Sequence, residues 1–514
     1  MSPTSLEGAE STGSTARRFD NVMRMDLRLL IVAVPLAVLV LIAGSLYFVQ
    51  ITRGIGLVAG LNRPTYWGLY LVNCVFFVGV SAGGVVIASL VYAFGLHEFK
   101  PIARIAELMS ISCTVMATSS LFVNLCWPTR MLYILRYPHP TSPVFWDMVN
   151  LTTYMIISVT YAYFGTRADL VRVMRAKPRY AWLYRLLSLG YTDLSPEALS
   201  RDQRILRILG GMVLVAEVGV QTVSAWLFGL QKARPGWFGG MMAPLFIIFA
   251  IISGLAVLTA SIVLTRRLLR LGITDAVIRK LGTIVLFLIP VMGYFLFVEL
   301  VTVLYGAEPA QLNVYRAMMF GPYALMFWGH LILGLIFPLL LLTVVLLRIR
   351  RRTLWFVGLI LLHFFAISAA WFHFPVPYPS LWHGLPGWAV YALLWVLGMG
   401  ALSACADDRI GEDLRIGLAM FLVAAGVFAA RWNIVVPSLS EHSYLPFDLP
   451  SYVPTVKEIL VIVGVYALGG LIYIASVMLL PLLDSEEAEP AEEVPIRIQE
   501  YRLESEVQPY TGGS

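Results

Sequence analysis

Apolar segments of about twenty residues follow one another along almost the whole chain. A segment of this length crosses the hydrocarbon core of a bilayer as a helix, and backbone in lipid must satisfy its hydrogen bonds internally. Of the 514 residues, 59% are hydrophobic and only 13% are charged, against about 25% charged in soluble domains. The sequence therefore predicts an all-α integral membrane protein in which lipid surrounds most of the chain. The predicted spans lie near residues 29–49, 66–94, 103–126, 143–166, 206–229, 241–265, 279–305, 321–347, 354–373, 386–404, 414–430 and 455–481.

Arginine and lysine gather in alternate loops between these spans. Such loops stay on the cytoplasmic side of a membrane, so we expect a multi-pass protein of the cell inner (cytoplasmic) membrane with both termini in the cytoplasm. The formal net charge of +6 reflects these loops and does not suggest a nucleic-acid partner. The basic clusters lie at residues 17–28, 100–104, 167–207, 266–280 and 348–352.

The two ends of the chain have a different composition. Residues 1–24 are rich in Ser, Thr and Gly, and residues 483–514 form an acidic tail with few apolar residues. Sequences of this kind cannot bury enough apolar surface to fold alone. We expect both ends to be disordered; docking of the tail on a partner is the alternative.

Among the acidic residues within or at the ends of predicted spans, four are candidates for a functional role, because a charge there is costly without a partner or a function. Glu107 follows Arg104 by three positions, a spacing at which the two side chains pair on one helix face. Asp147 begins a span, where the helix dipole favours a carboxylate. Glu217 and Glu299 have no such explanation. We expect each of them to face a water-filled cavity, a partner or a proton path.

His139 lies in the turn Tyr137-Pro138-His139-Pro140, shortly before Asp147. A histidine and an aspartate at one membrane face are able to take the two protons of a quinol as its electrons leave. The structural alternatives are a surface histidine in a proline-rich turn and a carboxylate at a helix start.

The sequence lacks recognisable metal-binding motifs. Its four cysteines form no Cys-X-X-Cys pair and no haem-attachment motif. His330, His363 and His373, the histidines within or at the ends of spans, do not form the paired ligands that a di-haem bundle needs. We therefore expect no metal, haem or iron–sulfur cluster in this chain.

Several short motifs follow one another along residues 65–480. They include Trp67-Gly68-Leu69-Tyr70, Ser81-Ala82-Gly83-Gly84, Ser142-Pro143-Val144-Phe145-Trp146-Asp147, Glu299-Leu300-Val301-Thr302 and Arg431-Trp432-Asn433. In their order and spacing these motifs resemble the NrfD/PsrC family, the membrane subunits of polysulfide reductase, of the nitrite-reductase quinol module and of alternative complex III. Residues 431–455 are most similar to the subunits of alternative complex III.

The resemblance implies about 10–12 transmembrane helices built around two four-helix bundles. Residues 25–64 would form a first helix and an outer loop, and residues 65–230 the first bundle. The second bundle would begin in residues 231–350, with further transmembrane helices in residues 351–482.

The resemblance also implies a quinone, either menaquinone or ubiquinone, bound non-covalently at the outer face of the first bundle. Asp147 and His139 would accept the protons of its reduced form. The electrons would pass to an extrinsic iron–sulfur subunit and to multihaem cytochrome subunits, and a second NrfD-like membrane subunit is a further expected partner. The residues expected to contact the quinone are Asn73, Phe76, Phe77, Asn124, Arg130, Trp146 and Tyr154.

Four positions depart from the family pattern by losing a proton-accepting group, one of them Phe238, where the family has His after Pro-Gly-Trp. Asn124 stands where the family has Asp or His, Gln221 where many members have His, and Ala430 where Glu is usual. These losses keep a second hypothesis open, a quinol-inactive paralogue that serves as membrane anchor and proton conduit. The residues of its proton path would be Glu217, Glu299, Glu107 and Asp169.

A secondary transporter is the third hypothesis. About twelve spans and cytoplasmic termini fit it, but the sequence shows neither an inverted repeat nor paired Gly- or Pro-broken helices at matching positions.

Overall fold

The computed structural model describes residues 27–61, 65–92, 95–125, 127–269, 273–348, 410–440 and 452–480, with positions 393 and 396. These residues form helices and connecting turns, with no strand among them. Nine helical stretches among them are long and apolar enough to cross a membrane, which confirms the all-α integral membrane fold; Ala324–Leu347 is one of the nine, whereas Pro143–Ala176 is not. The expected spans at 354–373 and 386–404 and the expected disordered ends lie outside the described residues.

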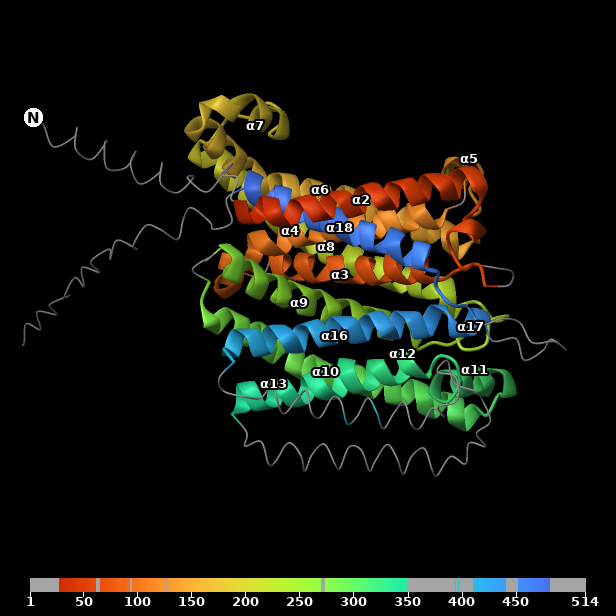
Figure 1. Ribbon diagram of the computed structural model, residues 1–514. Helices are drawn as coiled ribbons and strands as arrows, with labels where there is room; N and C mark the ends of the chain where they lie inside the picture. Colours follow the sequence, from red (N-terminus) through yellow and green to blue (C-terminus); the bar gives the residue numbers. More distant parts are fainter. Residues whose placement is uncertain are drawn as a thin grey trace, which may run out of the picture.

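The long helices run in roughly the same direction, side by side (Figure 1). They are α2 (Leu27–Arg53), α3 (Leu69–Tyr92), α4 (Lys100–Asn124), α6 (Pro143–Ala176), α8 (Pro196–Gly229), α9 (Met242–Leu269), α10 (Asp275–Gly306), α16 (Glu412–Val435) and α18 (Val456–Leu479). The expected span at 321–347 consists of three consecutive segments: α12 (Ala324–Trp328), a π-helical segment (Gly329–Ile336) and α13 (Phe337–Leu347).

Short helices lie at the two ends of the long ones. Those at one end are α5 (Tyr133–Arg136), α11 (Pro309–Met319) and α17 (Pro437–Ser440), whereas α7 (Ala181–Leu187) lies at the other (Figure 1). The first end also holds the start of α6, and we call it the Asp147 end; the second holds the start of α4, and we call it the Arg104 end. Single turns of 3-10 helix cover Ile55–Leu57, His97–Phe99, Pro128–Leu132 and Pro178–Tyr180.

Two groups of four helical rods pack side by side. In the first group α3 packs against α4 and α8, and α8 packs against α6. In the second, α9 packs against α10 and α16, and α13 packs against both α10 and α16. Helices α2 and α18 form a pair that lies against α4 of the first group.

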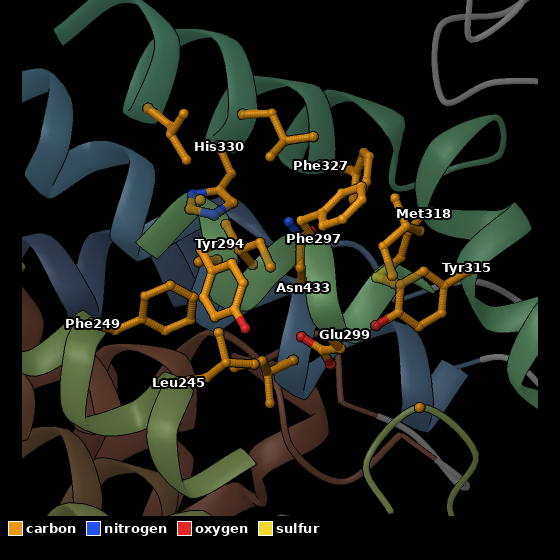
Figure 2. Close-up of a pocket in the computed structure, with 18 of the residues that line it drawn as sticks. Leu245, Phe249, Tyr294, Phe297, Glu299, Tyr315, Met318, Phe327, His330 and Asn433 are labelled. Carbon is orange, nitrogen blue, oxygen red and sulfur yellow. The ribbon is translucent and has the colours of Figure 1, made fainter. Parts of the chain in front are cut away.

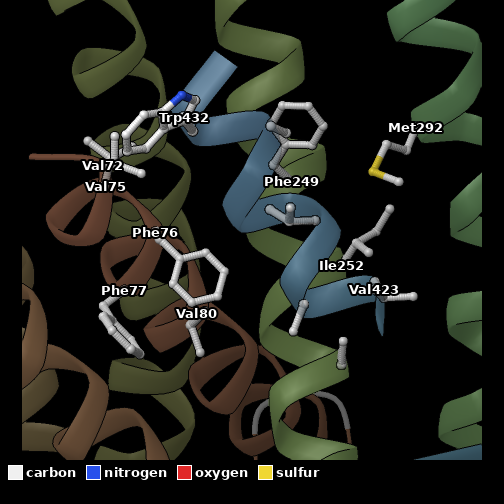
Figure 3. Packing of buried hydrophobic residues seen from close by; sticks show 14 of the residues in the cluster. Val72, Val75, Phe76, Phe77, Val80, Phe249, Ile252, Met292, Val423 and Trp432 are labelled. Carbon is white, nitrogen blue, oxygen red and sulfur yellow. The ribbon is translucent and has the colours of Figure 1, made fainter. Parts of the chain in front are cut away.

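The two groups meet where α3 crosses α9. A Cβ atom added to Gly83 would lie 2.1 Å from the carbonyl carbon of Gly254, so the two backbones are in direct contact. Small residues allow this approach, and dispersion forces between closely packed helices replace the hydrophobic driving force that lipid removes. Figure 3 shows the adjoining core. Phe76 and Val80 of α3 belong to the same buried cluster as Ile252 of α9 and Val423 of α16.

Candidate functional site

Asp147 links α6 to α8 at the Asp147 end. Helix α6 begins at Pro143, whose fixed φ suits a first helical position, so Asp147 lies just beyond the first turn. Its Oδ1 atom accepts a hydrogen bond of 2.6 Å from the Ser224 hydroxyl of α8. The half-buried carboxylate is therefore held at a fixed place between two helices.

A small cavity of about 270 Å³ is lined by residues of α6 and α8 that adjoin Asp147 and Ser224 in sequence, although neither Asp147 nor Ser224 lines it. The Trp146 indole forms part of its wall and donates a hydrogen bond of 2.7 Å to the carbonyl of Pro140, which ties the proline-rich turn to the helix. Asn150 and Trp226 also line this cavity. His139, in the same turn, is exposed, and its Nδ1 lies 2.9 Å from the Thr141 hydroxyl.

A row of buried polar groups continues from Asp147 into the first group of helices. The Glu217 carboxylate accepts a hydrogen bond of 2.7 Å from Gln221, one turn along α8. The Tyr154 hydroxyl faces Glu217 and lies 3.4 Å from the Ser81 hydroxyl of α3. Because Ser110 of α4 donates to the Ser81 carbonyl at 2.9 Å, the row reaches all four helices.

The row approaches a buried ion cluster at the Arg104 end. Arg104 of α4 donates to Glu107 at 2.7 Å and to Asp169 of α6 at 2.5 Å, and Arg172 donates to the other oxygen of Asp169 at 3.1 Å. The expected pairing of Glu107 with Arg104 is thus present. Arg104, Glu107 and Asp169 are each less than 10% exposed, so these groups join α4 to α6 as ion pairs.

The structure separates some residues that the sequence analysis groups together. Phe76 and Phe77 line a different cavity of about 590 Å³, bordered by α4, α9, α16 and α18. Asn73 is fully buried and donates a hydrogen bond of 2.6 Å to Ser120 of α4. Asn124 ends α4, and the Arg130 guanidinium lies over the ring of Trp127. Trp146, Asp147, Tyr154 and Glu217 are the predicted residues that share the α6–α8 region.

Glu299 belongs to another site, in the second group of helices. It lines a cavity of about 450 Å³ between α9, α10, α11, the π-helical segment and α16, whereas Gln221 and Tyr154, the neighbours of Glu217, lie on α8 and α6. In Figure 2 the Tyr315 hydroxyl of α11 points towards the Glu299 carboxylate. His330 and Asn433 line the same cavity.

Sequence reasoning does not identify this second site. It considers His330 only as a haem ligand, and it does not select Tyr315 or Asn433 as site residues. A histidine within an apolar span is the available signal. The described residues contain no group of three or more His, Cys, Asp or Glu side chains that could hold a metal ion.

Fold and site together define a multi-pass α-helical membrane protein with acidic side chains inside its helical bundles. The model of the family "Polysulphide reductase, NrfD" matches residues 57–375 of the sequence. The chain belongs to this family.

Three relatives show how widely the similarity extends. A Halobacterium salinarum protein, provisionally named as the C membrane subunit of dimethyl sulfoxide reductase, is 28% identical over 87% of this chain and 90% of its own length. The C subunit of the selenate reductase of Mesobacillus selenatarsenatis is 26% identical over 58% of this chain and 71% of its own. The Hdr-like menaquinol oxidoreductase integral membrane subunit of Archaeoglobus fulgidus is 22% identical over 84% of this chain and 88% of its own length.

Proposed function

We propose that this chain is the membrane subunit of a quinone-linked oxidoreductase complex and oxidises quinol beside Asp147. The observation that carries the proposal is the Asp147 carboxylate, held by Ser224 between α6 and α8, where Trp146 and Val223, the neighbours of these two residues in sequence, wall a cavity. The names of the relatives support it, since all three are subunits of reductases or oxidoreductases and one is a menaquinol oxidoreductase.

The chemistry requires a base and an electron acceptor. Oxidation of a quinol gives a quinone, two protons and two electrons. Asp147 takes one hydroxyl proton as a general base, and the second proton leaves through the exposed mouth of the site beside His139. Both electrons pass to an extrinsic iron–sulfur subunit and from there to multihaem cytochrome subunits. The quinone is menaquinone or ubiquinone, and the site faces the outer side of the cytoplasmic membrane.

The polar row supports a second function, proton conduction through the first group of helices. Glu217 is 3% exposed, and its Oε2 has no hydrogen-bond partner among the described residues. A buried carboxylate oxygen without a partner is costly in a membrane and is suited to accept a proton or a water molecule. In this function the chain would be an anchor and proton conduit beside a second NrfD-like subunit.

Replacement of Asp147 by Asn tests the first function. The amide keeps the shape of the side chain but is not a base, so quinol oxidation by the purified complex should fall on the order of 10²–10⁴-fold. The rate is measured anaerobically with a reduced naphthoquinone and an artificial electron acceptor. Asp193→Asn is the matched control, because Asp193 is an exposed carboxylate at the Arg104 end. Full activity in Asp147→Asn, with all subunits still assembled, would leave the conduit function.

A further inference from the structure

The cavity around Glu299 has polar groups that its own walls leave unused. Its volume of about 450 Å³ lies within the range of roughly 300–1,000 Å³ that is typical of ligand sites. Most of its wall is apolar, with Leu245 and Phe249 from α9 and Phe297 from α10 around the polar side chains (Figure 2). Such a cavity suits a mainly apolar ligand that carries a few polar atoms.

His330 is the first unused group. It is 3% exposed, and its Nδ1 lies 2.8 Å from the carbonyl of Gly426 on α16. Because a carbonyl only accepts, Nδ1 carries the hydrogen, and Nε2 of the neutral ring is then an acceptor. This Nε2 is buried without a hydrogen-bond partner in the described part of the chain. The ring is fixed further by Phe249, which meets it edge to face at 5.8 Å.

Asn433 and Glu299 add two more acceptors. The Asn433 amide nitrogen donates to the Met326 carbonyl at 3.3 Å, and its Oδ1 is buried without a partner among the described residues. The Tyr315 hydroxyl points towards the Glu299 carboxylate (Figure 2). The cavity therefore offers acceptors from three side chains, and the hydroxyl-bearing side chains of Tyr294 and Ser438 also line it. A ligand that satisfies His330 Nε2 and Asn433 Oδ1 must bring donors.

We propose that this cavity is a second quinol site, which binds the reduced ring through its hydroxyl groups and discriminates against the oxidised ring. A quinol presents two O–H donors on opposite sides of an apolar ring, whereas a quinone presents two acceptors that would face His330 Nε2 and Asn433 Oδ1 unpaired. A buried polar group left without a partner is costly. The isoprenoid tail leaves between Tyr294 and Phe297, both of them exposed on α10. The choice of quinol as ligand rests on the proposed function, but the site is separate from that of Asp147.

Binding is measured on the full chain in nanodiscs, together with the subunits that co-purify, under anaerobic conditions. The probes are 2,3-dimethyl-1,4-naphthoquinol and the corresponding quinone, followed by equilibrium dialysis. The wild type should bind two quinols per chain. His330→Leu should weaken one of the two sites by about tenfold, as expected for one lost hydrogen bond. The quinone should bind this site at least about tenfold more weakly than the quinol.

A second variant fills the cavity without removing a polar group. A Cβ at Gly293 would meet only Leu335, at 3.5 Å, an ordinary contact. Gly293→Ala should therefore bind as the wild type does, whereas the longer side chain of Gly293→Met should abolish binding at this site. Ser112→Ala, in the cavity bordered by Phe76 and Phe77, is the control and should bind both quinols.

The outcomes separate this site from the Asp147 site. Equal affinity for quinol and quinone, or two bound quinols in both His330→Leu and Gly293→Met, would overturn the second site. Recovery of phospholipid instead of the probe from this cavity would overturn it as well. If Asp147→Asn alone removes all quinol binding, the second site is wrong and the proposed function stands. If the Asp147→Asn variant oxidises quinol at the normal rate while His330→Leu weakens binding, the proposed function is wrong and the second site stands.

Discussion

At the residue scale, two aspartates at opposite ends of the bundle, Asp147 and Asp169, have different surroundings. Asp169 is held by two arginines, Arg104 and Arg172, and a carboxylate in such a cluster is committed to holding helices together. Asp147 instead accepts a hydrogen bond from a neutral hydroxyl, that of Ser224. A carboxylate with a neutral donor keeps more capacity to accept a proton, so Asp147 rather than Asp169 is suited to catalysis.

The Ser224 hydroxyl should matter for the orientation of Asp147. In Ser224→Ala the carboxylate loses a donor and is free to rotate away from the quinol, and we expect quinol oxidation to fall about three- to tenfold, in line with a hydrogen bond of about 1 kcal/mol. Ser224→Thr keeps the hydroxyl and is the matched control. Turnover of the two variants is compared at saturating quinol, and equal rates would contradict a positioning role.

At the element scale, close backbone contact between α3 and α9 joins the two groups of helices. A Cβ at Gly254 would lie 2.4 Å from the Cα of Gly83, and backbone atoms cannot give way as a flexible side chain does. Gly254→Ala should therefore destabilise the protein by about 1–3 kcal/mol, the usual cost of overpacking. Gly44→Ala on α2 is the control, since nothing lies within 4 Å of its added Cβ. The midpoints of thermal unfolding in detergent are compared; an equal midpoint for both variants would show that the helices move apart freely.

The helices are predictable because twenty consecutive apolar residues have few alternatives in a bilayer. Their limits are not, since α6 continues to Ala176, ten residues beyond the expected span. Its last turns contain Arg167 and Asp169, whose charges are satisfied by Asp202 and Arg104. Such pairing between helices is invisible in an apolar pattern. The π-helical segment at Gly329–Ile336 escapes prediction for a similar reason, because hydropathy does not distinguish α from π windings.

The proximity of candidate site residues can be predicted from the sequence only where the residues lie on one helix. Asp147, Trp146 and Tyr154 lie on one helix, so their proximity follows from spacing along α6. Tyr315, His330 and Asn433 come from three different elements, and only the packing of α11, the π-helical segment and α16 around α10 brings them to one cavity.

Phe76 and Phe77 show the opposite case, in which residues close in sequence serve different cavities. They follow Asn73 on α3, and the sequence analysis assigns all three to the neighbourhood of Asp147. In the structure the two rings line the cavity bordered by α4, α9, α16 and α18. The reason is that α3 presents several faces to different neighbours, and an apolar pattern does not indicate which face meets which helix.

At the scale of the whole molecule, charge is unevenly divided between the two ends. Three regions lie at the Arg104 end: the connection from α6 to α8, the end of α9 and the start of α10. Together they carry most of the basic residues of the segment from α6 to α10. Basic loops remain in the cytoplasm, so the Asp147 end is expected on the outer side. Quinol oxidised at Asp147 would then release its protons outside, and the reaction would contribute to a proton gradient.

Cysteine labelling tests this orientation. Lys232 and Arg201 are both exposed, the first at the Asp147 end and the second at the Arg104 end, and each substitution by Cys removes one positive charge. In a background whose four native cysteines are replaced by alanine, a membrane-impermeant maleimide should label Lys232→Cys in intact cells. Arg201→Cys should react only after the membrane is opened. The reverse pattern would place the Asp147 site on the cytoplasmic side, where quinol oxidation would release its protons into the cytoplasm and would not build a gradient from them.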